Sequence, residues 1–90
     1  MKTLERTFII KKEHGVHTRV ACNLVETAAG FSSRILLTCG ERTADCSSIL
    51  DILGMAAGCG AVVSIRISGE DAEEAMRAMA DLLECREEVT

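Results

Sequence analysis

Residues 61–68, A-V-V-S-I-R-I-S, give the clearest secondary-structure signal in the chain. Branched apolar residues occupy every second position from 63 to 67, and serine or arginine occupies the positions between and after them. A period of two with β-branched residues predicts a strand that has one buried and one exposed face. Such a strand requires a sheet with one face covered by other elements.

Six further elements are expected around this strand. We expect strands at 3–11, 34–39 and 42–45, and helices that begin after residue 17, at Ser48 and after Asp71. The predicted apolar stripes of the helices are Ala21, Leu24, Val25 and Ala28; Ile49, Ile52, Leu53 and Ala56; and Ala75, Met79, Leu82 and Leu83. S-I-L-D at 48–51 and D-A-E-E at 71–74 have the spacing of capping boxes.

The resulting order, β-α-β-β-α-β-α, favours an α+β fold. We expect a four-stranded antiparallel sheet with three helices on one face. The other face should be largely exposed and include Thr7, Ser64, Arg66 and Ser68. With 90 residues the chain has room for one hydrophobic core, so residues 1–90 are expected to form one domain.

Composition narrows the classes of function. No apolar run approaches the roughly 20 residues of a membrane span, and residues 1–6 lack the features of a signal peptide. A net charge of −4 and only two aromatic residues argue against nucleic-acid binding. We therefore expect no membrane insertion and partners that are proteins or small anions. We also expect a monomer and, because the cysteines are typical of a reducing compartment, a cytoplasmic location.

Cysteine and histidine content does not favour a metal site. The five cysteines are odd in number and form no CxxC pair, so most are expected to be small apolar fillers. His14 and His17 are three residues apart, but metal sites need three or four ligands. No metal and no cofactor is expected.

The sequence His17-Thr18-Arg19 combines three features suited to phosphate chemistry. A neutral imidazole is a good phosphoryl acceptor. The start of a helix offers unpaired N–H groups and the positive end of the helix dipole. The Arg19 guanidinium can pair with phosphate oxygens. A histidine near a helix cap is otherwise often structural or simply solvated.

Three segments resemble one known family. G-V-H-T-R-V-A at 15–21 resembles the active-site motif G-[LIV]-H-[TA]-R-P-A of HPr, the histidine-containing phosphocarrier of the bacterial phosphotransferase system. The segment 48–60 is similar to the regulatory-serine segment of that family, and G-E-D-A at 69–72 matches the turn before its last helix. The resemblance spans essentially the whole chain.

The resemblance implies an HPr-like open-faced sandwich and a carrier that is not itself an enzyme. His17 would accept phosphate from enzyme I on the ring nitrogen nearer the backbone and pass it to enzyme II A domains. Arg19 would stabilise the phosphate, and the N–H groups of Thr18 and Arg19 would help to hold it. Ser48 would be the target of an HPr kinase/phosphorylase, and phospho-Ser48 could act on a transcriptional regulator.

Partner docking is expected on an apolar surface around the histidine. Its expected residues are Val20, Ala21, Leu50, Leu53 and Gly54. Two positions depart from the family pattern: Val20 replaces a proline that preorganises the helix start, and Ser47 replaces a lysine.

Three alternatives remain at this stage. Ser48 could be only a helix cap. The domain could be a regulatory binding module or serve a nitrogen-related branch. A metal-handling α+β domain is disfavoured by the missing CxxC.

Overall fold

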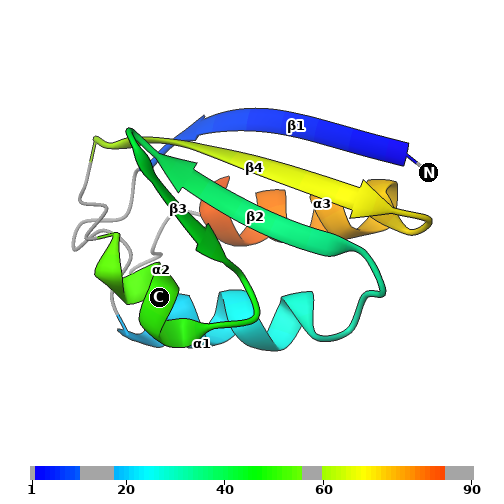
Figure 1. Cartoon of the computed structure of the whole chain (residues 1–90), viewed down its shortest axis with the longest axis horizontal. Coiled ribbons are helices and arrows are strands. Elements are labelled where there is room, and N and C mark those ends of the chain that lie inside the picture. Colours follow the sequence, from blue (N-terminus) through cyan, green and yellow to red (C-terminus); the bar gives the residue numbers. More distant parts are fainter. Residues whose placement is uncertain (1, 11–17, 56–59, 85–90) are drawn as a thin grey trace, which may run out of the picture.

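The predicted elements are present in the predicted order. The computed structural model describes residues 2–10, 18–55 and 60–84. Strands β1 (Lys2–Ile9), β2 (Arg34–Cys39), β3 (Arg42–Asp45) and β4 (Val62–Gly69) form one antiparallel sheet in the order β1-β4-β2-β3. Helices α1 (Thr18–Ala28), α2 (Ile49–Gly54) and α3 (Ala72–Glu84) lie on one side of it (Figure 1).

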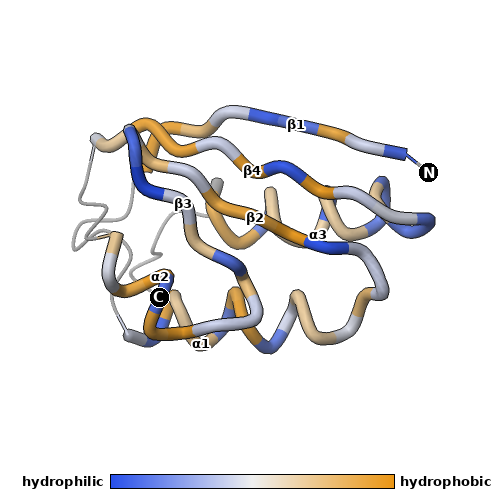
Figure 2. The backbone as a smooth tube through the Cα atoms, in the orientation of Figure 1, coloured by the Kyte–Doolittle hydropathy of each residue, from blue (hydrophilic) through white to orange (hydrophobic). Residues whose placement is uncertain are grey.

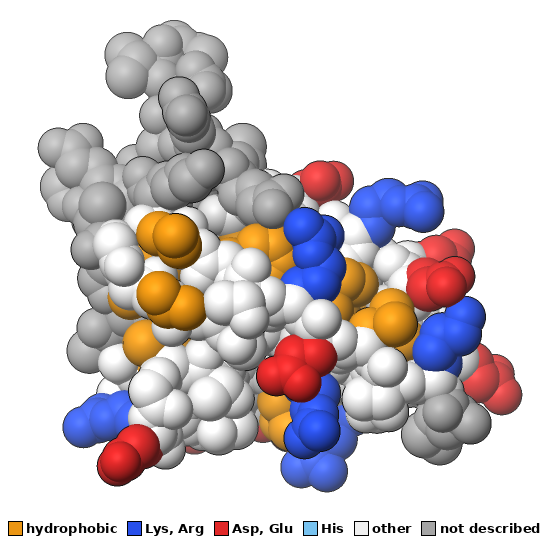
Figure 3. Space-filling model, turned by 90° about the horizontal axis from the view of Figure 1, so that it is seen from above, with side chains coloured by type: hydrophobic (Ala, Val, Ile, Leu, Met, Phe, Trp, Pro, Cys, Tyr) orange, Lys and Arg blue, Asp and Glu red, His pale blue; other side chains and the backbone are white. Residues whose placement is uncertain are grey.

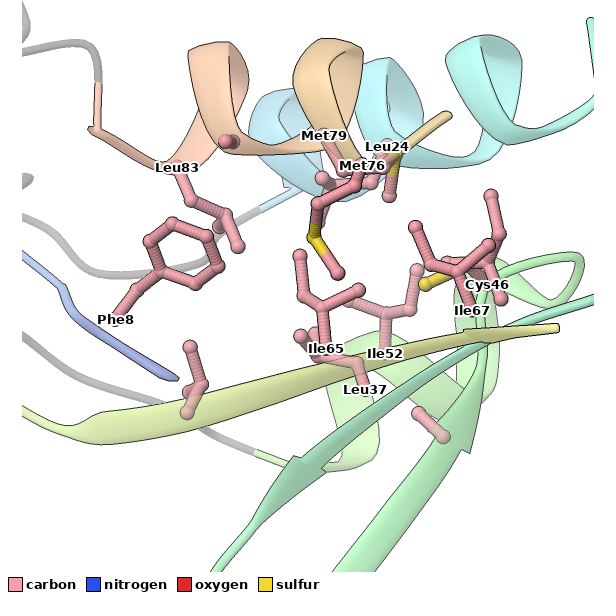
Figure 4. Close-up of a cluster of buried hydrophobic side chains, with 14 of the residues drawn as sticks. Phe8, Leu24, Leu37, Cys46, Ile52, Ile65, Ile67, Met76, Met79 and Leu83 are labelled. Atoms are coloured by element: carbon pink, nitrogen blue, oxygen red, sulfur yellow. The ribbon is translucent and has the colours of Figure 1, made fainter. Parts of the chain in front are cut away.

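The core lies between the sheet and the helices. β4 pairs with β1 on one edge and β2 on the other, and its Val63, Ile65 and Ile67 are completely buried. The hydropathy alternates along β4 as its sequence requires (Figure 2). Figure 4 shows Met79 and Leu83 of α3 on the opposite side of this core from Ile65. The period-two pattern of β4 therefore decides which sheet face the helices cover.

The outer sheet face is largely exposed, as predicted, and mostly polar except for the exposed pair Ile9 and Val62. Thr7 and Arg66 are exposed, and Ser64 and Ser68 are half-buried. Hydroxyl groups pair across β1 and β4, with 3.1 Å between the Thr7 and Ser64 oxygens and 3.2 Å between those of Thr3 and Ser68. The view from above shows charges of both signs scattered among smaller hydrophobic areas (Figure 3). The hydroxyl pairs between β1 and β4 stabilise this solvent-facing side of the sheet.

The ends of β1 differ slightly from the expected range 3–11. The strand ends at Ile9, although Ile10 continues the pairing: its N–H donates to the Ala61 carbonyl at 2.9 Å. Lys11 lies outside the described residues. Arg6 shares the inward face with Phe8, and its guanidinium lies 4.9 Å from the centroid of the Phe8 ring. Because β1 is an edge strand, the charged group can cover the ring and still reach water.

Asp71 has a different role from the expected cap of α3. Its carboxylate accepts hydrogen bonds from the Ser32 and Ser33 N–H groups at 2.8 and 3.0 Å, and from the Ser33 hydroxyl. These bonds join the loop after α1 to the turn before α3. The backbones approach so closely that a methyl group on Gly69, whose φ is 152°, would lie 2.2 Å from Ser33 Oγ. Sequence spacing identifies a helix start but not this long-range contact.

Candidate functional site

Two of the predicted phosphate-binding residues begin helix α1. Thr18 is its first residue and Arg19 its second, and both are exposed. His17 and His14 lie outside the described residues. The first N–H groups of a helix have no partner within the helix, so they can donate to an anion.

The charge at the start of α1 is unfavourable for the helix and favourable for an anion. The first turn contains no acidic residue, and Arg19 places a cation there. A cation near a helix N-terminus opposes the helix dipole, whereas an acidic residue would have stabilised the helix. A bound phosphate would interact favourably with both the guanidinium and the dipole. The local sequence is therefore better suited to holding an anion than to stabilising the helix.

Val20 and Ala21 do not form part of an exposed surface, contrary to the prediction. Val20 is 5% exposed and Ala21 is completely buried. They lie four and three residues before the buried Leu24, so all three occupy the inward face of α1. The docking prediction used proximity to His17 in sequence, whereas the predicted apolar stripe of this helix, which includes Ala21 and Leu24, placed Ala21 correctly. Their role is in the core.

Ser48 caps helix α2, as predicted. It has extended backbone angles, and its hydroxyl oxygen accepts from the Asp51 N–H at 3.2 Å. In a full capping box the Asp51 side chain would accept a hydrogen bond from the Ser48 N–H. Here the Ser48 N–H donates instead to the Asp45 carbonyl at 2.9 Å. Since only its oxygen is needed for the cap, the O–H of Ser48 can still point away from the helix.

The neighbouring Ser47 is held differently. Its N–H and its hydroxyl both donate to Asp45 Oδ1, at 2.9 and 2.8 Å. These two bonds lower the pKa of Asp45 and keep it ionised at neutral pH. The two adjacent hydroxyls therefore differ: the Ser47 hydroxyl donates to a carboxylate, and the Ser48 hydroxyl accepts from a helix N–H.

The second helix supplies the exposed apolar residues of the predicted docking surface. Leu50 is 77% exposed, Leu53 is half-buried and Gly54 is exposed. Helix α2 packs against α1, and Figure 1 shows it near the start of α1. Leu50, Leu53 and Gly54 therefore lie on the same end of the molecule as Thr18 and Arg19.

Sequence reasoning missed Arg42 as part of this region. Its Nη1 donates to the Gly54 carbonyl at 2.6 Å, at the C-terminal end of α2. A cation there satisfies a free carbonyl and complements the helix dipole. Arg42 also lines, with Leu50 and Asp51, a hollow of about 340 Å³. Only the fold of β3 against α2 brings these residues together.

The prediction that the cysteines are apolar fillers is supported for Cys46, which lies in the core, and for Cys39, which packs against it. Cys46 is completely buried, and Cys22 and Cys39 are half-buried. Burial, and then the charge of Asp45, raises the pKa of the Cys46 thiol to about 12. Across 2–10, 18–55 and 60–84 no three potential metal ligands come together, and none of the helices described is long and apolar enough to cross a membrane.

Comparisons with known proteins agree with this geometry. The family described as "PTS HPr component phosphorylation site" matches residues 4–85. A phosphocarrier protein HPr of Xylella fastidiosa is 36% identical over 92% of this chain and 93% of its own length. A phosphocarrier protein NPr of Shewanella violacea is 31% identical over 96% of this chain and 94% of its own.

Solved structures show the same fold. HPr from Thermoanaerobacter tengcongensis has a TM-score of 0.85 and 37% identity, over 90% of this chain and 91% of that one. Crh from Bacillus subtilis has a TM-score of 0.72 at 23% identity, which is a likeness of fold. Sequence, element order and fold agree, and the chain belongs to the HPr family of phosphocarrier proteins.

Proposed function

We propose that His17 is the phosphoryl acceptor and that enzyme I of the phosphotransferase system is the donor. The lone pair of the neutral His17 ring nitrogen nearer the backbone attacks the phosphorus atom. The bond from phosphorus to the donor group of enzyme I breaks, and its electron pair returns to that group. In the second step, a histidine of an enzyme II A domain attacks the phosphorus on His17, and the bond from His17 to phosphorus breaks. The carrier is left unchanged after each cycle.

One observation supports this proposal most directly. Helix α1 begins at Thr18, the residue that follows His17 in sequence, and its first turn has a cation but no acidic group. A phosphate on His17 would therefore be next to a helix start that favours negative charge. Arg19 adds positive charge to this helix start, and its guanidinium can pair with phosphate oxygens.

Intact mass after incubation with phosphoenolpyruvate and enzyme I tests the assignment. We expect one added phosphoryl group that is lost in acid, because protonated imidazole is a good leaving group. His17→Ala should prevent the addition, and the matched variant His14→Ala should retain it. An acid-stable adduct, or phosphorylation of His17→Ala, would contradict the assignment.

The exposed apolar side of α2 is proposed as the docking surface for these partners. Leu50, at 77% exposed, is its centre, with Leu53 and Gly54 beside it. Exposed apolar residues of this kind are typical anchors of protein interfaces. Leu50→Ala should raise the KM for enzyme I with little change in kcat or stability. The control is Val62→Ala, which also shortens an exposed apolar side chain but on the sheet, and it should change neither KM nor kcat.

A second candidate is a carrier in a branch other than sugar transport. It is favoured by relatives of similar identity that have two different names, HPr and NPr. Transfer rates from the enzyme I of each branch present in the same cell would separate the two. The faster donor identifies the branch, and equal rates would contradict a dedicated role.

Ser48 is further proposed as the target of an ATP-dependent kinase. Its hydroxyl lies at the start of α2 next to the exposed Leu50, so a phosphate there would change the docking surface. Incubation with HPr kinase/phosphorylase and ATP should add one acid-stable phosphate, absent in Ser48→Ala and present in Ser47→Ala. The opposite pattern would assign the modification to Ser47.

A further inference from the structure

An apolar cavity of about 410 Å³ lies at the other end of α1 from Thr18. Its walls come from the last turns of α1, the loop after it, and the chain at the start of β2 and the end of β3. Val25, Ala28, Phe31 and Ile35 form its apolar lining. None of these residues belongs to the phosphoryl-transfer site described above.

The cavity is open to solvent, because the part of the chain that the structure describes covers its α1 lining only in part. Leu24, one position earlier, is completely buried, but Val25, Ala28 and Phe31 are only half-buried. Helix α2 begins at Ile49, after the chain has passed Cys46 and Ser47 at the cavity wall (Figure 1). The apolar lining is therefore accessible to a small molecule.

Two opposite charges stand at the rim. Arg34 Nε lies 4.0 Å from Asp45 Oδ2, and the two side chains are 73% and 38% exposed. The hydrogen bonds from Ser47 keep the Asp45 carboxylate ionised. An anion alone would be repelled by Asp45, and a cation alone by Arg34. A molecule with both charges fits the rim best.

We propose that this cavity binds a free apolar L-amino acid such as leucine or phenylalanine. The side chain lies against Val25, Phe31 and Ile35, the carboxylate meets Arg34, and the ammonium group meets Asp45. A cavity of about 410 Å³ is within the usual range for small-molecule sites. An exposed ion pair at 4.0 Å contributes little, so ligand charges can replace each partner without a large loss.

A titration of the ¹⁵N-labelled chain, followed by NMR, tests the proposal. L-Leucine and L-phenylalanine should shift the amide signals of Val25, Ala28 and Phe31 saturably, with a Kd on the order of 1 mM. Three control ligands each lack one feature: glycine lacks the apolar side chain, N-acetyl-L-leucine lacks the ammonium group, and L-leucinamide lacks the carboxylate. Each should bind at least about tenfold more weakly. No saturable shift up to roughly 20 mM, or equal binding of glycine, would overturn the proposal.

Matched variants locate the two charges. Arg34→Gln and Asp45→Asn should each weaken leucine binding by about tenfold or more. Arg77→Gln and Asp81→Asn, the same changes at exposed positions of α3 that do not line the cavity, should leave it unchanged. Arg34→Gln should also abolish the preference for leucine over L-leucinamide, which a merely structural change would not do. Equal loss in all four variants would refute a site at this rim.

Discussion

Replacing Gly69 by alanine should destabilise this fold more than alanine at the other described glycines considered below. Gly69 ends β4, with a φ of 152° that residues with a side chain rarely adopt. An added methyl carbon would lie 2.2 Å from Ser33 Oγ, 2.6 Å from its Cα and 2.7 Å from its Cβ. Ser33 cannot easily move away, because Asp71 accepts hydrogen bonds from its N–H and its hydroxyl.

Two penalties add at this position. The unfavourable backbone conformation costs about 1–3 kcal/mol, and forcing an extra methyl group into filled space costs about 1–3 kcal/mol. The expected loss is therefore roughly 2–6 kcal/mol, a large part of the 5–15 kcal/mol typical of the free energy of unfolding. For a domain of 90 residues, each kcal/mol lowers Tm by about 4–8 °C.

Urea and thermal unfolding of three alanine variants separates the penalties. Gly40→Ala has a φ of 63° but open space, and should cost about 1–2 kcal/mol for the conformation alone. Gly54→Ala has neither problem, and should leave stability unchanged or raise it by up to about 1 kcal/mol. Gly69→Ala should be the least stable. Adding Ser33→Gly should restore only part of the loss, since the Ser33 Cα remains.

Equal stability of Gly69→Ala and Gly40→Ala would refute this reasoning. It would mean that the turn after β4 moves away from Ser33 at no cost. The hydrogen bonds of Asp71 would then not hold the two loops together.

Four other measurements test the site and the core. Arg19→Ala should slow phosphoryl transfer by about one to two decades, because a charged phosphate contact is worth roughly 1.5–3 kcal/mol. Arg19→Lys should lie in between, and both variants should keep the fold. Unchanged kinetics would exclude a role of Arg19 in transfer. Ser48→Asp should fold normally yet raise the KM for enzyme I, because it adds charge beside the docking surface. Ser47→Asp should raise this KM less. If neither variant differs from wild type, Ser48 is only a cap. The hydrogen bond from the Ser33 hydroxyl is the main cause of the lowered pKa of Asp71. The ionised Asp71 carboxylate therefore stabilises the folded state above about pH 4, and this stabilisation is lost as pH falls through the lowered pKa. Asp71→Asn should therefore be less stable than wild type at pH 7, and the difference should shrink as pH falls through the lowered pKa of Asp71. A difference that does not change with pH would contradict this sign. Burial holds the pKa of Cys46 at about 12, so iodoacetamide at about pH 8 should modify it only in denaturant.

Local sequence patterns determined the order and type of the elements. Alternation at 61–68 is enough to predict a strand with one buried face, which the structure shows at Val62–Gly69. Ser48 followed by Asp51 is enough to predict a capped helix. These signals depend on residues close together in the chain, so they can be recognised without coordinates. The start of α1 at Thr18, on which the proposed phosphate-binding role of Thr18 and Arg19 rests, could be predicted in the same way.

Only the tertiary structure decided which residues around the site are exposed and which segments meet. Val20 and Ala21 are buried because the rotation of α1 against the core, rather than distance from His17 in sequence, sets their exposure. Arg42 reaches the Gly54 carbonyl, and Asp71 reaches Ser33, across 12 and 38 positions of sequence. Contacts of this kind depend on how whole elements pack against one another, and this packing depends on the entire core. A short stretch of sequence therefore cannot predict them.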